Sequence, residues 1–194
     1  MKRKNISRIL IVFGVLLIVS AISLLLFRSA FISNNILKAE NTVTALNELM
    51  PEITDITYDG RKNNDMASIQ IDGTDYIGIL EVPDFQLKLP ICSKGNQPDA
   101  KSLPYRYSGS IYDGSLILGG EDYKGQFEFL KAVDERNVIT ITDLDGDRYT
   151  YKVYSVERVS DCNAKRLESN EDDLTLFCKN TFGMNWVIVR CKMM

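Results

Sequence analysis

Hydrophobic residues follow two contrasting patterns along this chain. Residues 9–27 form an uncharged apolar run of 19 residues, long enough as a helix to cross a bilayer. From residue 76 onward, apolar residues come in short runs rich in β-branched and aromatic side chains, several alternating with polar ones. Such runs predict β-strands. The predicted strands cover 76–82, 85–91, 115–119, 137–144, 148–159, 174–178 and 186–191.

The segment between these two parts has a different pattern. Residues 31–50 place Ile36, Val43, Ala45, Leu46 and Leu49 at helical spacing, which predicts an amphipathic stalk helix stopped by the proline at 51. The polar stretch 52–75 resembles a linker. The pattern therefore predicts a tail (1–8), an anchor (9–27), a stalk and linker (28–75) and a packed domain (76–194).

Turn residues within the domain favour a mainly β fold. Asp145-Gly146 is typical of a hairpin turn between two strands, and residues 126–133 are the only clear candidate for a short helix. A calcium loop beginning at Asp143 is the alternative, but its twelfth position is Tyr154 and not the glutamate that such loops need. No internal repeat is present, so we expect a single closed or nearly closed β-barrel.

Basic residues flank the apolar run mainly on its N-terminal side. Four lie within residues 1–8, and one, Arg28, follows the run. Because positive flanks stay inside the cell, we expect a single-pass anchor with a cytoplasmic N-terminus and an extracellular domain. A cleaved signal peptide is the alternative, but the run exceeds the usual 7–15 residues and no Ala-x-Ala site follows closely.

The part beyond the anchor is acidic. Residues 29–194 contain 18 Lys and Arg against 26 Asp and Glu, a formal charge of −8. This balance argues against nucleic acid and against anionic lipid headgroups as ligands of the domain. The only membrane contact expected is through residues 9–27.

Four cysteines, which lack any Cys-x-x-Cys spacing, lie in this outer part. A metal ribbon is therefore not expected, and three disulfide pairings remain open. Free cysteine is among the most buried residue types, so buried thiols are the favoured interpretation. The four are Cys92, Cys162, Cys178 and Cys191.

Several segments between residues 76 and 194 occur in an order that is typical of one family. They are Pro83, LPI (89–91), LPYRYSGSIY (103–112), SLILGGEDYKGQFEFL (115–130), TDLDGDRYTYKV (142–153), DLTLFC (173–178) and WVIVRC (186–191). With these segments, residues 76–194 resemble the sortase family of the small Firmicute type. The resemblance implies an eight-stranded β-barrel, no cofactor and a cysteine transpeptidase that joins proteins to a Gram-positive cell wall or to each other in pili.

Sortase chemistry requires a cysteine nucleophile, a histidine for proton transfer and an arginine for the oxyanion. This chain contains no histidine. Where the family has Ala-Gly-His-Asn-Tyr, residues 119–123 read Gly-Gly-Glu-Asp-Tyr, which places Glu121 at the histidine position. The family's cysteine position falls on Lys179, and counting back from VIVRC (187–191) places Trp186 at the arginine position.

Cys178 is the alternative nucleophile. Side chains alternate along a strand, so a residue next to the groove-facing position faces the core. A carboxylate such as Glu121 would also raise the thiol pKa. We therefore expect a buried, structural Cys178. Arg190 lies about 13 Å along the strand from Trp186, too far to replace the missing arginine, so we expect a surface or barrel-end charge.

The residues at the three catalytic positions leave alternatives open. Glu121 and Lys179 form an ion pair across the groove or remain solvated, and Trp186 is a binding platform or a packed core residue. Two functions follow. One is a catalytically inactive pseudo-sortase that binds a sorting-signal-like peptide, a pilin or an active sortase, and the other is a divergent transpeptidase or peptidase that uses Cys178.

Overall fold

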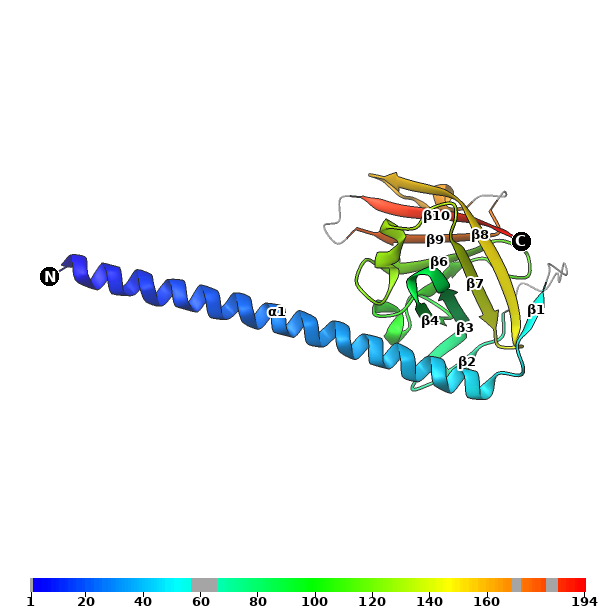
Figure 1. The fold of residues 1–194 in the computed structure, drawn as a ribbon, viewed down its shortest axis with the longest axis horizontal. Coiled ribbons are helices and arrows are strands. Elements are labelled where there is room, and N and C mark those ends of the chain that lie inside the picture. The colour runs from blue at the N-terminus through cyan, green and yellow to red at the C-terminus, as the bar shows by residue number, and fades with distance from the viewer. Residues whose placement is uncertain (1, 57–65, 169–171, 181–184) are drawn as a thin grey trace.

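The apolar run and the stalk form one continuous helix, α1 (Lys2–Leu49), which leads into a β-barrel (Figure 1). The computed structural model describes residues 2–56, 66–168, 172–180 and 185–194. α1 ends two residues before Pro51, which cannot continue a helix. Within α1, Ile11–Leu49 is long and apolar enough to cross a membrane, with a mean hydropathy of 2.6 in its most apolar window.

One face of the stalk packs on the outside of the barrel. Ala39, Val43 and Leu46 are buried against a cluster that includes Ile79 and Leu89, from strands β3 (Thr74–Val82) and β4 (Leu87–Cys92). The predicted stalk face is correct at Val43 and Leu46. It is wrong at Leu49, which is 59% exposed because the helix ends beyond the sheet that it covers.

Eight strands close the barrel. The hydrogen-bonded order runs β3-β4-β5-β6-β9-β10-β8-β7 and returns from β7 to β3. β4 pairs with β5 and β6 with β9 in parallel, and the other neighbours are antiparallel. The predicted eight-stranded barrel is confirmed. The remaining strands of the barrel are β5 (Tyr105–Ser108), β6 (Leu116–Glu121), β7 (Val138–Asp143), β8 (Asp147–Val159), β9 (Leu174–Lys179) and β10 (Trp186–Met193).

Two further strands extend the sheet, and they correct the expectation that residues 52–75 are only a linker. β1 (Thr54–Ile56) pairs in parallel with β8, and β2 (Ile69–Ile71) pairs antiparallel with β3. Each has only three residues, too few for an alternating pattern to be recognised. The RKNND stretch at 61–65 lies outside the described residues.

The predicted hairpin between β7 and β8 is present. Gly146 has a φ of +83°, which favours glycine, and the Asp143 carboxylate accepts the backbone N–H groups of Asp145 and Asp147 at 3.0 Å each. The acidic segment 143–147 therefore forms the hairpin turn, and its Asp143 carboxylate stabilises that turn. The short helix expected at 126–133 is the 3₁₀ helix η3 (Phe127–Lys131). Two other 3₁₀ helices are η1 (Pro83–Phe85) and η2 (Pro98–Lys101), and α2 covers Ala164–Leu167.

All four cysteines are free thiols. Cys92, Cys178 and Cys191 are buried, as expected for structural thiols. Cys162 is an exception because it lies at the edge of a small outer cluster and stays partly exposed.

Candidate functional site

Glu121, Lys179 and Trp186 lie in one row across three neighbouring strands. Glu121 ends β6 and pairs in register with Lys179, which ends β9, and Lys179 pairs with Trp186 at the start of β10. The row lies at the barrel end where β9 leads into β10, on the side from which α1 approaches (Figure 1). Positions up to 65 residues apart in the sequence thus share one site.

The side chains of the row do not form the Glu–Lys ion pair considered above. Among the described residues, no salt bridge joins Glu121 to Lys179, and both are exposed. The Lys179 ammonium lies instead 5.5 Å from the centroid of the Trp186 ring. This arrangement is a cation–π contact at the protein surface.

Aromatic rings continue the row along the outer face of the barrel. Phe177 packs against Trp186 with ring centroids 6.1 Å apart, and edge-on against Tyr107 at 5.4 Å. Trp186 is partly buried and borders the outer apolar cluster, whereas Tyr107 is 45% exposed. Trp186 is therefore packed on one side and accessible on the other.

Two glycines let β6 pass between aromatic side chains. A Cβ at Gly119 would stand 2.6 Å from the Tyr105 ring, and one at Gly120 would stand 2.5 Å from the Phe127 ring. The Gly-Gly step before Glu121 therefore permits close packing on both faces of the strand.

Cys178 faces the barrel interior, as predicted. Its side chain is fully buried, and its thiol lies 3.9 Å from the carbonyl oxygen of Phe127. The pKa of this thiol is raised to about 12, chiefly by burial and also by the Asp122 carboxylate, while the Lys131 ammonium opposes the shift. The thiolate, the reactive form, is therefore strongly disfavoured at neutral pH.

The turn after Glu121 is held by contacts that sequence reasoning missed. The Glu121 backbone N–H donates to the side-chain oxygen of the buried Gln126, and Asp122 pairs with Lys131 at 2.6 Å. The Tyr123 hydroxyl donates to the carbonyl of Ser102 at 2.6 Å. These residues carry no recognisable spacing, and only the barrel closure brings them together.

The position of Arg190 contradicts the expectation of a surface or barrel-end charge. Its side chain is only 13% exposed and forms ion pairs with Glu157, at 2.6 Å, and with Asp172. It also donates to the carbonyl of Arg166 at 2.7 Å. Arg190 is therefore the centre of a mostly buried network, not a surface charge, because strand alternation places it on the face covered by the α2 segment.

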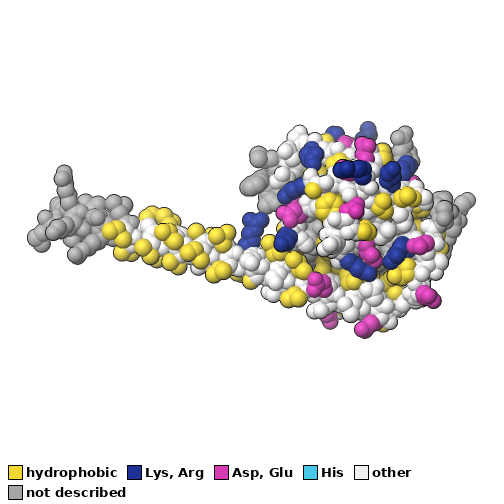
Figure 2. All heavy atoms as spheres, viewed as in Figure 1, with side chains coloured by type: hydrophobic (Ala, Val, Ile, Leu, Met, Phe, Trp, Pro, Cys, Tyr) yellow, Lys and Arg dark blue, Asp and Glu magenta, His cyan; other side chains and the backbone are white. Residues whose placement is uncertain are grey.

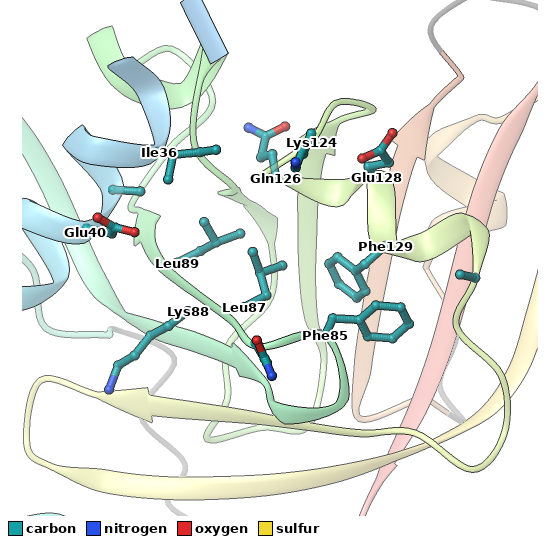
Figure 3. Close-up of a pocket in the computed structure, with 14 residues that line it drawn as sticks. Ile36, Glu40, Phe85, Leu87, Lys88, Leu89, Lys124, Gln126, Glu128 and Phe129 are labelled. Atoms are coloured by element: carbon teal, nitrogen blue, oxygen red, sulfur yellow. The ribbon is translucent and has the colours of Figure 1, made fainter. Parts of the chain in front are cut away.

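A cavity of about 520 Å³ lies next to this site, between α1, β4 and η3 (Figure 3). Leu87, Leu89, Phe85 and Phe129 point into it, while the charged side chains stand at its rim. Gln126 lies between the cavity and the Glu121 turn. Within the described ranges, no group of three His, Cys, Asp or Glu residues could hold a metal ion.

Several solved structures of sortases have a similar fold. The chain resembles sortase C1 of Streptococcus agalactiae (20% identity, TM-score 0.56, 68% of this chain and 72% of that chain covered). It also resembles sortase C of Clostridium perfringens (19% identity, TM-score 0.54, 83% and 88% covered) and sortase D5 of the same organism (16%, 0.53, 64% and 82%). The comparison with curated proteins found no match.

The sequence itself matches a family model. The sortase domain model covers residues 80–194, which is more than half of the chain and includes the whole barrel except most of β3. This match spans the strands that carry Glu121, Lys179 and Trp186. The chain therefore belongs to the sortase family.

Proposed function

We propose that this protein is a catalytically inactive sortase homologue, a binding or accessory module in cell-surface protein or pilus anchoring. The observation that carries the proposal is the row of Glu121, Lys179 and Trp186. These residues occupy the three positions where the family resemblance implies the base, the nucleophile and the oxyanion partner. In another enzyme, loss of a nucleophile or base alone costs about a millionfold in kcat.

The site keeps features suited to binding. The partly exposed Tyr107 and Trp186 rings flank the buried Phe177 ring, and together the three rings form an aromatic row beside the exposed Lys179. Aromatic surfaces supply large contact areas for peptides. The proposed ligand is a sorting-signal-like peptide, a pilin or an active sortase.

The alternative of a divergent transpeptidase that uses Cys178 has little support. The thiol is buried on the face opposite the aromatic row, and its pKa is raised to about 12. Activation would need rotation of the strand and a base other than imidazole, because the chain contains no histidine.

The test is a cleavage and transfer assay on the purified full chain with Leu-Pro-x-Thr-Gly peptides and an amine acceptor. We expect no turnover above background, with the same result for Cys178→Ala. Turnover that disappears in Cys178→Ala would overturn the proposal. As a positive arm, the triple variant Glu121→His, Lys179→Cys, Trp186→Arg should form an acyl-enzyme if the groove positions these groups to within about 1 Å.

We further propose that α1 anchors the protein in the cell membrane with residues 1–8 in the cytoplasm and the barrel outside. The basic flank before the apolar run supports this orientation. Protease added to intact cells should then remove the barrel. Full protection of the barrel in intact cells, with digestion after lysis, would reverse the orientation.

A further inference from the structure

A groove of about 420 Å³ runs along α1 where the helix leaves its most apolar part. Its helical lining residues follow an i, i+3, i+4, i+7 spacing, so they form one stripe on one face of α1. Lys124, from the turn that follows Glu121, closes the groove from the barrel side. The stripe consists of Leu25, Arg28, Ser29, Ile32, Ser33 and Ile36.

Contacts with the turn 122–125 fix the position of the barrel along the axis of α1. A Cβ at Gly125 would stand 2.6 Å from Ile36, so the turn backbone lies directly on the helix. Tyr123 packs edge-on against Phe31 at 6.4 Å and accepts a hydrogen bond from Asn35 at 3.4 Å. These contacts keep Lys124 on the same helix face as Arg28.

The groove lies at the level of the membrane surface along the axis of α1. Arg28 is the first residue after the apolar run, and Ile36 lies about 12 Å further along the helix axis. The headgroup layer on each side of a bilayer is roughly 5–7 Å thick. The lower half of the groove therefore lies among the headgroups when residues 9–27 span the membrane, and lysine side chains extend readily toward that layer.

The chemistry of the groove fits a phosphate. Its lining includes two cations, Arg28 and Lys124, two serine hydroxyls and no carboxylate. Neither cation forms an ion pair with another described residue, and the neighbouring Asp122 is already paired with Lys131. Figure 2 shows basic side chains where the apolar helix meets the body of the protein. The net negative charge of the domain as a whole thus does not extend to this groove.

We propose that this groove binds the phosphate of an anionic membrane phospholipid, with Arg28 and Lys124 as its cationic ligands. The bound lipid would hold the Glu121 turn, and with it the candidate site, close to the membrane surface. Above Ile36 and Lys124 the groove continues into the cavity of Figure 3, where both side chains are seen at the upper rim. The inference rests on the membrane-anchored part of the proposed function.

The test measures lipid retention by the full chain in a mild detergent. Equal amounts of phosphatidylglycerol and phosphatidylcholine with the same acyl chains are added, and native mass spectrometry counts the lipids that stay bound. We expect a preference for phosphatidylglycerol that falls about fivefold for Arg28→Gln or Lys124→Gln and disappears in the double variant. Lys152→Gln, which changes an exposed lysine on β8, serves as the matched control and should leave the preference unchanged.

Two outcomes would overturn the inference. One is an equal retention of both lipids by the wild type, or a preference that the double variant keeps. The other is displacement of the lipid by millimolar glycerol phosphate, which would identify a soluble phosphate as the ligand. Resistance of the full chain to alkaline extraction from membranes tests the anchor separately, so a failure of the lipid site is distinguishable from a failure of the anchor.

Discussion

Lys179 and Trp186 face each other across β9 and β10, with the lysine ammonium 5.5 Å from the centre of the indole ring. In the family resemblance, these two positions belong to the nucleophile and the arginine. Their contact holds a cation over an aromatic face at these two positions. Under the proposed function, this pair serves binding and not nucleophilic attack.

We expect Lys179→Met to have a small effect on stability. An exposed cation–π contact contributes only about 0.5–1 kcal/mol, so the free energy of unfolding should fall by at most about 1 kcal/mol. Because Trp186 is the single tryptophan, its fluorescence reports directly on the contact and should change in this variant. Lys152→Met is the control, and a loss above about 2 kcal/mol would mean that Lys179 supports the barrel itself.

Cys178 should react slowly with thiol reagents. Burial raises its pKa to about 12, so the thiolate fraction stays very small at pH 7 and grows about tenfold with each pH unit. Cys162, which is partly exposed, should be alkylated first even though burial also raises its pKa. Mass spectrometry of alkylated peptides orders the sites, and unfolding in denaturant should equalise all four. Rapid labelling of Cys178 near pH 7 would support the alternative function, a divergent transpeptidase that uses this thiol.

The sequence predicts most barrel strands because they are long enough to show their pattern, but the four-residue β5 is not among the predicted ranges. β8 has 13 residues and β10 has eight, and both were recognised from β-branched and aromatic runs. The three residues of β1 carry no such pattern, and β1 forms only because β8 offers a free edge. Strand pairing is a tertiary property that short segments do not encode locally.

The candidate site was predictable only in part. The positions of Glu121, Lys179 and Trp186 came from the resemblance, and alternation correctly turned Cys178 inward. The contact between Lys179 and Trp186, and the buried role of Arg190, depend on the register of β10 against its two neighbours. That register follows from barrel closure, which no local pattern specifies.

A buried carboxylate clamps the stalk to the barrel. Lys38 of α1 pairs with Asp99 at 2.5 Å, and the Tyr76 hydroxyl donates to the same carboxylate at 2.6 Å. Burial alone would raise the pKa of Asp99, but the hydrogen bonds from Lys38 and Tyr76 outweigh it and keep the pKa below its usual value. The clamp thus contributes stability above about pH 4, the usual aspartate pKa, and this contribution is lost as the pH falls through the lowered pKa.

Asp99→Ala should therefore destabilise the protein by about 2–4 kcal/mol at pH 7, since it leaves the buried Tyr76 hydroxyl without its acceptor and Lys38 without its partner. The difference from wild type should shrink below about pH 4. Denaturant unfolding followed by circular dichroism at several pH values measures both effects. Asp161→Ala, at an exposed position, is the control, and a pH-independent difference would contradict the electrostatic part of the argument.

Two arginines of this chain allow a buried and a surface ion pair to be compared directly. Arg190 is 13% exposed and pairs with Asp172, whose side chain is 2% exposed, and with Glu157. Arg136 is 90% exposed and pairs with Asp134. Removing one partner of a buried pair leaves an uncompensated charge, whereas surface pairs contribute little because water and salt screen them.

Arg190→Met should consequently lower the free energy of unfolding by about 3–5 kcal/mol, and Arg136→Met should change it much less. Arg190, by its hydrogen bond and charge, holds the pKa of Glu157 below its usual value. The wild type therefore loses this contribution as the pH falls through that lowered pKa, and the difference between the wild type and Arg190→Met should narrow in acid. Denaturant titrations at pH 7 and near pH 3 measure the difference. Equal effects of the two substitutions at pH 7 would show that Arg190 acts as an ordinary surface charge despite its burial.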